Sequence, residues 1–430
     1  MAVVIGIVVG IGIFRLPPII ALNSSCELQF LLFWVAGGFI SLMGALCYAE
    51  LSSSMPNAGG EYHFLKKGFG DATGFFLSWG RMTVIQVGSI ALIAFILGDY
   101  ATVILDLGKY SASIYAAAMV LILTALNITG TRHSSRTQNI LTSVILLALV
   151  TTIIAGFIFT PGETSRLTLL EKDTPVFSSG AAGLAMIFVL LTYGGWSEAA
   201  YLTEELHNAR KSIVRVLFFG IVTITTLYLL VNISYIHVLG FDGLRESETV
   251  AYDFTERIFG PVSSLVVVVL VVVSALSTAN ATIITGARTN YALGRDLRLL
   301  GFMGKWNARR NTPVNALLVQ GFMSLFLVGI GAWSQQAIET IVDYTAPVFW
   351  VFILLTTLCL FIFRFRNTMS ASAYRIPFYP IPPLLFLFAC AYMLYSSLMY
   401  TGKGAVVGVI ILLAGFPVWF FANRYQKTKL

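Results

Sequence analysis

The sequence predicts an all-α integral membrane protein of about twelve transmembrane helices. Its 430 residues are 57% hydrophobic and only 11% charged, whereas soluble domains carry about 45–50% apolar and about 25% charged residues. The apolar residues gather in runs of about 20, the length that an α-helix needs to cross a bilayer. Transmembrane β-strands would instead alternate over about 10 residues. The run 262–281 is apolar or small almost throughout, which excludes a β-barrel.

Short polar segments separate the apolar runs and give the expected helix positions. These are residues 2–22, 30–50, 72–98, 112–130, 138–160, 180–203, 213–238, 262–292, 313–332, 338–364, 381–400 and 405–423. Because the number of spans is even, both ends of the chain are expected on the same side of the membrane.

Charge indicates which side that is. Most of the 27 Lys and Arg residues fall in the connections on the side of the two termini, among them Lys66, Lys67 and the basic segment 295–310. Cytoplasmic connections are enriched in Lys and Arg, so both termini are expected in the cytoplasm. The acidic segment 241–260 then becomes an external connection. Arg81 lies inside the third span near its cytoplasmic end, and its side chain is expected to reach back toward water.

Glycines interrupt two of these helices at equivalent positions. The first helix contains Gly10-Ile11-Gly12 shortly before Pro17-Pro18, and the sixth, five spans later, contains Tyr193-Gly194-Gly195-Trp196. Paired interruptions of this kind indicate a transporter built from two inverted repeats with broken helices 1 and 6. We expect the first repeat of five helices in residues 1–160, the second in residues 179–364, and two additional helices in residues 365–430.

A broken helix leaves N–H groups unpaired on one side of the break and C=O groups unpaired on the other. A zwitterionic amino acid satisfies both, because its carboxylate suits the N–H groups and its ammonium suits the carbonyls. The expected carboxylate site is the N–H groups around Ile11, Gly12 and Ile13, and the expected ammonium site is the carbonyls near Ile7 and Thr192.

Two alternatives stay open for these residues. The glycines could be small residues at helix contacts. The aromatic side chains of Phe14, Tyr193 and Trp196 could cover a bound substrate or could be ordinary packing aromatics.

Several segments match the pattern of a known family. They are residues 10–14 (GIGIF), 45–51 (ALCYAEL), 56–62 (PNAGGEY), 193–196 (YGGW), 203–205 (TEE), 277–280 (STAN) and 286–288 (GAR). In this combination the chain resembles the amino acid–polyamine–organocation superfamily of transporters, and within it the L-type amino acid transporter branch.

The resemblance implies a ten-helix inverted-repeat core with two extra helices, alternating access, and an α-amino acid held by the two breaks. It places the carboxylate site at Gly10 to Ile13 and lines the side-chain pocket with Thr192, Tyr193 and Gly194 under Trp196. Ser197 stands where the branch often has an Asn that contacts substrate.

Other positions depart from the family pattern. Ile145 stands where sodium-independent members commonly carry a lysine in place of sodium, so the coupling is open. Ser277 and Thr278 could offer hydroxyl oxygens to sodium, or could bond back along their own helix. Gln86 stands where a glutamate-exporting relative has an arginine, which favours neutral substrates.

Two further departures concern the ends and partners of the chain. The eukaryotic branch pairs with a glycoprotein through a cysteine between helices 3 and 4, and residues 99–111 contain none. A stand-alone transporter of a bacterial inner membrane, without a disulfide-linked heavy subunit, is therefore expected. The chain starts directly at the first helix, without the usual cytoplasmic segment, so an N-terminal extension is also expected.

The acidic residues suggest two further roles. Glu198 lies two residues beyond Trp196 in an apolar helix, where a carboxylate must be paired, protonated or hydrated. Proton coupling and a structural hydrogen bond are equally open for it. Residues of the inner connections could form a gate of ion pairs, or a solvated face: Glu61, Glu204, Glu205, Arg288 and Arg295.

The main prediction is a secondary transporter of neutral L-amino acids that works by exchange or proton-coupled uptake. A cationic amino acid or polyamine transporter is the first alternative and would need an anion in the pocket, for which Glu198 is the candidate. A membrane receptor for amino acids is the second alternative. No enzyme, metal site or cofactor is expected, because no nucleophile–base motif, zinc spacing or phosphate-binding glycine loop is present.

Overall fold

The computed structural model of the chain describes residues 10–57, 59–158, 179–205, 209–333, 337–370, 373–400 and 402–427. In chain order the elements are η1 (Ile11–Phe14), α2 (Pro17–Leu22), α3 (Glu27–Ser54), α4 (Glu61–Phe69), α5 (Asp71–Gly80), η2 (Arg81–Ile85), α6 (Gln86–Ile104), α7 (Ser111–Thr129), α8 (Thr131–Ile158), α9 (Ser179–Thr192), η3 (Trp196–Glu205), α10 (Ala209–Leu239), α11 (Phe241–Glu246), α12 (Val250–Phe259), α13 (Pro261–Asp296), η4 (Arg298–Leu300), α14 (Val314–Gly331), α15 (Ala337–Phe365), α16 (Ile381–Tyr400), α17 (Lys403–Leu413) and α18 (Gly415–Lys427).

This fold confirms the prediction of an all-α membrane protein. Within the described residues, nine helical stretches are long and apolar enough to cross a membrane, and residues 142–158 and 180–192 form shorter apolar helices. Each predicted span corresponds to one or more helices, although the first is described only from Gly10. The third span consists of α5, η2 and α6, and the twelfth of α17 and α18. The division into two repeats stays a prediction.

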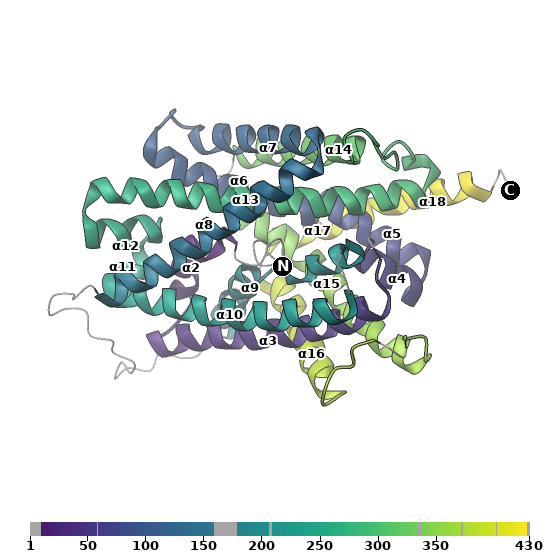
Figure 1. The fold of residues 1–430 in the computed structure, drawn as a ribbon, viewed down its shortest axis with the longest axis horizontal. Helices are drawn as coiled ribbons and strands as arrows, with labels where there is room; N and C mark the ends of the chain where they lie inside the picture. Colours follow the sequence, from purple (N-terminus) through teal and green to yellow (C-terminus); the bar gives the residue numbers. More distant parts are fainter. Residues whose placement is uncertain are drawn as a thin grey trace.

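The connections contain helices that the sequence analysis did not expect. The helix α4 lies between the second and third spans, and α11 and α12 form the connection before α13. Figure 1 shows the long helices running roughly along one axis, with α11 and α12 at one end and α4 at the other. The acidic and basic connections thus lie at opposite ends. Which end faces the cytoplasm stays a prediction.

The helix α13 is the longest element and packs against α6, α7, α8 and α14. In Figure 1, α3 and α10 run side by side along one edge, and α7 and α14 run along the opposite edge. Apolar side chains on the outer helices are exposed, for example Ile122, Leu147, Phe219 and Phe322. An apolar outer surface over helices of this length is the surface of a protein embedded in lipid.

A buried ion pair fastens the connection between α15 and α16 to the end of α3. Arg364 donates to both carboxylate oxygens of Glu50, at 2.7 Å each, and the backbone N–H of Ile376 donates to the same carboxylate at 2.8 Å. The side chain of Glu50 is only 2% exposed. Two more backbone N–H groups of this connection donate to serines of α3: Ser370 to Ser54 and Tyr374 to Ser53.

Candidate functional site

The first break lies between Gly10 and Pro17. Gly10 is extended, with φ −84° and ψ 174°, and the chain then forms the short 3₁₀ helix η1. The N–H groups of Arg15 and Leu16 both donate to the Gly12 carbonyl, at 3.1 and 2.8 Å. Pro17 has no N–H to continue this pattern and suits the first position of the new helix α2. The interruption predicted from the glycines is therefore present.

The second break lies between α9 and η3. The helix α9 ends at Thr192, and the N–H of Gly194 closes a turn onto the Leu191 carbonyl at 3.0 Å. Gly195 has a φ of +96°, a conformation that glycine adopts without the steric penalty of a Cβ. A 3₁₀ helix starts immediately afterwards at Trp196. This interruption, too, lies where the sequence predicted it.

The two breaks touch each other. A Cβ added to Gly12 would lie 3.1 to 3.3 Å from three atoms of Thr192, including its Cα. Only glycine allows so close an approach without displacing a neighbour. The segments that interrupt the first and sixth spans are thus in direct contact with each other.

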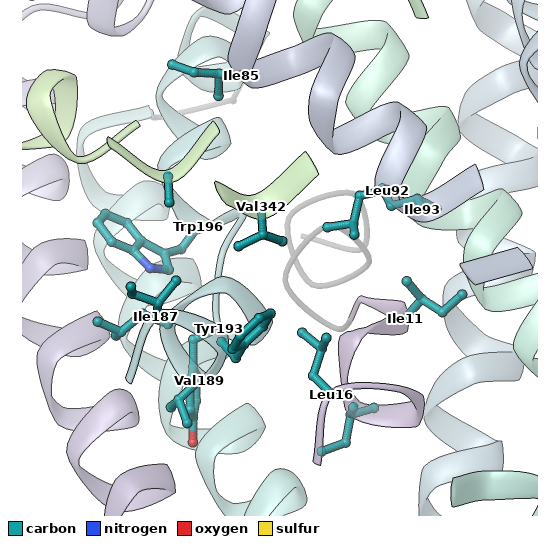
Figure 2. Close-up of a cluster of buried hydrophobic side chains, with 14 of the residues drawn as sticks. Ile11, Leu16, Ile85, Leu92, Ile93, Ile187, Val189, Tyr193, Trp196 and Val342 are labelled. Carbon is teal, nitrogen blue, oxygen red and sulfur yellow. The ribbon is translucent and has the colours of Figure 1, made fainter. Parts of the chain in front are cut away.

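A cavity of about 1140 Å³, including the space open to solvent, lies against both breaks. Its wall is completed by residues of α6, α13 and α15. Figure 2 shows apolar side chains from several of these elements, including Ile11 from the first break, Leu92 from α6, Ile187 from α9 and Val342 from α15. The polar residues of the wall are Gln86, Ser89, Thr192, Ser197, Glu198, Thr278, Thr282 and Thr345.

Most of the site residues predicted from the sequence line this cavity. They are Gly10, Ile11, Gly12, Thr192, Gly194, Ser197, Glu198, Gln86 and Thr278. Ile7 lies outside the described residues. Ile13, Ile145 and Ser277 are described and fully or almost fully buried, but they are not part of the cavity wall.

Two predicted aromatic residues pack away from the main cavity. The hydroxyl of Tyr193 donates to the Trp34 carbonyl at 3.0 Å, so its ring points into the protein interior. Trp196 packs edge-to-face on Tyr48 and Phe386, with ring centroids 5.1 and 5.7 Å apart. It borders a smaller pocket beside the main cavity instead. A role for Trp196 as substrate cover stays a prediction.

The carbonyl of Thr192, predicted to receive the ammonium group, already accepts one hydrogen bond. The hydroxyl of Tyr228 donates to it at 3.3 Å. A carbonyl has two lone pairs and can accept a second donor. The hydroxyl of Thr278, one of the two candidates for sodium, donates to the Ser274 carbonyl of its own helix at 3.1 Å, which is the alternative that the sequence left open.

Arg81 is buried, and the expectation that it reaches back toward water is wrong. It opens the π-helical turn η2 and is only 2% exposed. Its Nη2 donates to both oxygens of Glu198, at 2.7 and 2.9 Å, and its Nη1 donates to Glu61 at 3.3 Å. Two carboxylates compensate the cost of burying this cation, so it does not need water. π-helical turns occur frequently at functional sites.

The Arg81 cluster comprises Arg81, Glu61, Glu198, Gln86, Tyr48 and Tyr201. Glu61 accepts hydrogen bonds from the hydroxyls of Tyr48 and Tyr201, at 2.5 and 3.0 Å. The Tyr201 ring lies 4.5 Å from the Arg81 guanidinium. Burial raises the pKa of the Glu61 carboxyl, the charge on Glu198 acts in the same direction, and Arg81 opposes both.

Gln86 connects the Arg81 cluster to the cavity wall and to α13. Its Oε1 accepts from Arg81 at 2.7 Å, and its Nε2 donates to the Thr282 carbonyl at 2.7 Å and to the Thr285 hydroxyl at 3.2 Å. The sequence analysis expected no cation at this position. A cation is next to it, but two carboxylates already share that cation.

For Glu61, the partner in the structure differs from that of the predicted ion-pair gate, and the gate pairs of Glu204 and Glu205 stay a prediction. Glu61 pairs with Arg81 and not with Arg288 or Arg295. A separate pair joins α4 to the end of α13: Lys66 lies 2.6 Å from Asp296, which also accepts from the Tyr62 hydroxyl at 2.5 Å. The side chains of Glu204 and Glu205 lie outside the described residues.

Metal chemistry finds no support in the described part of the chain, which contains no group of three His, Cys, Asp or Glu residues placed to hold a metal ion. The four cysteines, Cys26, Cys47, Cys359 and Cys390, are free thiols. What the site offers is a cavity with backbone at two broken helices and a buried charge cluster beside it.

A family model described as amino acid permease matches residues 1–421 of the chain. The chain belongs to the amino acid permease family. The permease is 28% identical over 432 residues to b(0,+)-type amino acid transporter 1 of Mus musculus. The alignment covers 99% of this chain and 87% of that protein. It is 28% identical over 436 residues to large neutral amino acids transporter small subunit 2 of Homo sapiens, covering 99% and 79%. Asc-type amino acid transporter 1 of Mus musculus is 29% identical over 438 residues, covering 99% and 80%.

These relationships confirm the resemblance noted in the sequence, and with it the prediction of an amino acid transporter. The permease is a multi-pass membrane protein of a family of transporters, not of enzymes. Sequence reasoning missed that Glu61 and Arg81 form one cluster with Glu198. The only signal in the sequence was a pair of ionisable residues, Arg81 and Glu198, inside apolar spans, where such residues usually pair with one another.

Proposed function

We propose that the permease carries neutral L-amino acids across the membrane by alternating access, with the substrate backbone bound at the two breaks. The observation that carries the proposal is the cavity formed against Gly10 to Gly12 on one side and Thr192 to Gly195 on the other. Backbone groups that a helix would otherwise pair are available at such breaks. The substrate carboxylate would bind at the first break and the ammonium group near the Thr192 carbonyl.

The charge of the cavity wall favours neutral substrates. Glu198 is the only acidic residue among the described residues of the wall, and Arg81 contacts both of its oxygens. A lysine or polyamine side chain would have to compete with a guanidinium that is already in place. The name of one relative points the same way, since it is called a large neutral amino acids transporter.

The size and lining of the cavity support a broad choice of side chains. Pockets for small molecules are usually about 300–1,000 Å³, and the space here, about 1140 Å³, includes the part that is open to solvent. Ile85, Leu92, Val342 and Phe349 give it apolar surface. Branched and aromatic side chains would therefore find apolar partners in the cavity wall.

For orientation and assembly, we propose both termini in the cytoplasm, the inner membrane of a bacterium as location, and no disulfide-linked partner subunit. The basic connections around α4 and η4 support the orientation, and the absence of a cysteine in residues 99–111 supports the last point. Labelling single cysteines at Lys67 and Asp242 with an impermeant reagent on whole cells tests the orientation. Labelling at position 67 alone would overturn it.

Counterflow in proteoliposomes tests the transport proposal. Proteoliposomes that contain the purified permease are loaded with unlabelled leucine. Uptake of labelled alanine and labelled leucine is then measured at equal internal and external pH. Uptake stimulated by internal leucine, and inhibited by external neutral amino acids more than by lysine or putrescine, is expected. Stronger inhibition by lysine would favour the cationic alternative. Binding of labelled leucine without any uptake would favour a receptor and overturn the proposal.

A further inference from the structure

The Arg81 cluster contains one carboxylate more than its cation can balance. Arg81 forms ion pairs with both Glu61 and Glu198. Within the described residues, no second Lys or Arg forms an ion pair with either carboxylate. The other titratable groups of the cluster are the phenols of Tyr48 on α3 and Tyr201 on η3, which are uncharged at neutral pH.

Among the described residues, the remaining neighbours bring no further charge into hydrogen-bond or ion-pair contact with the cluster. The contacts that α6 and α13 make with it run through neutral groups, namely Gln86, Thr282 and Thr285. The side chains of Arg81 and Glu61 are each 3% exposed. An unbalanced charge in such a place costs several kcal/mol per ion, by order of magnitude. The cluster is therefore built to take up one further positive charge.

The geometry distinguishes the two carboxylates. Glu61 accepts from Tyr48, Tyr201 and Arg81, so its lone pairs are largely occupied and it leaves no room for a metal ion or an ammonium group. Glu198 accepts hydrogen bonds only from Arg81 among the described residues, its side chain is 13% exposed, and it lines the cavity. A positive charge that reaches the cluster from the cavity meets Glu198 first. Of the possible positive charges, a proton is the species that needs no additional volume.

We infer that the Arg81 cluster is a proton-binding site, in which Glu198 and Glu61 share one proton that enters from the substrate cavity and moves together with the amino acid. The inference rests on the proposed transport function and names the coupling ion. Binding forms one O–H bond on a carboxylate and breaks one O–H bond of a hydronium ion from the solution to which the cavity opens, which leaves a water molecule. Because both carboxylates contact the same guanidinium, the proton belongs to the pair and not to either residue alone.

Protonation would also change how the second break is attached. Glu198 lies in η3, directly after the break, whereas Arg81 lies in η2 of the third span. A protonated Glu198 exchanges its ion pair with Arg81 for a hydrogen bond between the guanidinium and a neutral carboxyl group, which lacks the attraction between two full charges. The proton thereby loosens the contact between the broken sixth span and the third span, next to the bound substrate.

Accumulation against a gradient in proteoliposomes tests the inference. The membrane potential is clamped with valinomycin and equal potassium on both sides, and an inward gradient of one pH unit is imposed. One proton per neutral amino acid predicts about tenfold accumulation of labelled alanine, with acidification of an internal pH dye. Counterflow at equal pH is measured in the same preparation.

Two variants of the cluster and one control make the test specific. Glu198→Gln and Glu61→Gln each remove the excess charge, so both are expected to lose the tenfold accumulation. Glu61 does not line the cavity, so Glu61→Gln is also expected to retain counterflow at equal pH. Asp242→Asn removes a carboxylate that is 85% exposed and lies outside the cluster, and it should accumulate alanine as the wild type does. If one cluster variant fails to fold, the other gives the result.

Each alternative outcome has a distinct reading. Wild-type counterflow without any response to the pH gradient would overturn the proton site and leave the transport function standing. Full accumulation by both cluster variants would also overturn it. Loss of lysine inhibition in Glu198→Gln, with no proton movement in the wild type, would show that a substrate cation fills the site instead. Absence of all uptake would contradict the proposed function itself.

Discussion

Replacing Arg81 by Met would leave Glu61 and Glu198 buried beside each other without their common cation. The variant loses four contacts: 3.3 Å to Glu61, 2.7 and 2.9 Å to Glu198, and 2.7 Å to Gln86. Removing one partner of a buried ion pair typically costs about 3–5 kcal/mol. With an unfolding entropy of about 2.1 cal/mol/K per residue, taken over the whole chain, this corresponds to a decrease in Tm of about 3–6 °C.

Thermal unfolding in detergent, followed by tryptophan fluorescence at one fixed scan rate, measures this loss. Arg257 supplies the control, because it is an exposed arginine of α12, and Arg257→Met is expected to change stability by less than about 0.5 kcal/mol. The loss in Arg81→Met should shrink at acidic pH, where the abandoned carboxylates take up protons.

Removing the charges together should reverse most of the loss. The triple variant Arg81→Met, Glu61→Gln, Glu198→Gln contains no buried charge in the cluster, and neutral replacements of a buried ion pair are often tolerated. If Arg81→Met melts within about 1 °C of the Arg257 control, or if the triple variant melts below Arg81→Met, the electrostatic argument for the cluster is refuted.

The remaining predictions concern the contact of the breaks, the protonation of Glu61 and the fastening of the α15–α16 connection. Gly12→Ala inserts a methyl group 3.1–3.3 Å from Thr192 and should lower alanine counterflow about tenfold or more; unchanged uptake would mean that the breaks need not touch. Folding raises the pKa of the Glu61 carboxyl. The unfolded chain therefore loses the Glu61 proton above the ordinary glutamate pKa of about 4.3, while the folded protein keeps it to higher pH. The free energy of unfolding thus falls as the pH rises from about 4.3 through the pKa of Glu61 in the folded protein. Glu61→Gln should remove this part of the slope of Tm against pH. Parallel plots of Tm against pH for the wild type and the variant would contradict the prediction. Glu50→Gln weakens the contacts with Arg364 and Ile376, so it should speed tryptic cleavage at Arg366 and Arg375 severalfold; an unchanged cleavage pattern would show that the ion pair does not hold this connection.

The sequence was sufficient for the features that depend on local composition. A span of apolar residues of bilayer length has to be helical because lipid offers no hydrogen-bond partners for backbone groups. The apolar runs of the sequence therefore predicted the transmembrane helices. The two breaks were predictable for a similar reason, since glycines and prolines in the middle of a span can be tolerated only where the backbone is re-satisfied. The helix α4 was not predicted because it is only nine residues long and several of its side chains are charged.

The Arg81 cluster could not be predicted, because its geometry depends on tertiary packing. Its charged members come from α4, η2 and η3, and Glu61 and Glu198 are 20 and 117 residues away from Arg81 in the chain. The π-helical turn at Arg81 also changes the direction in which that side chain points. A helical wheel drawn for a regular third span would have placed it differently.

The position of Trp196 depended on a residue nearly two hundred positions away. Its ring is covered by Phe386 of α16, in the pair of helices assigned as additional to the core. No periodicity in the sixth span indicates such a partner. Whether a tryptophan next to a break faces substrate or protein is decided by what packs behind it.

The contact between Trp196 and Phe386 makes α16 a working part of the carrier. Gly44 of α3 faces both rings, and a Cβ there would lie 2.5 Å from each, so α3, η3 and α16 are in close contact at this point. Any movement of the second break has to carry Trp196 past Phe386 or move α16 with it. The far side of α16 exposes Phe388, Tyr392 and Tyr395. A change in the lipid around α16 is therefore expected to reach the Trp196 ring through Phe386.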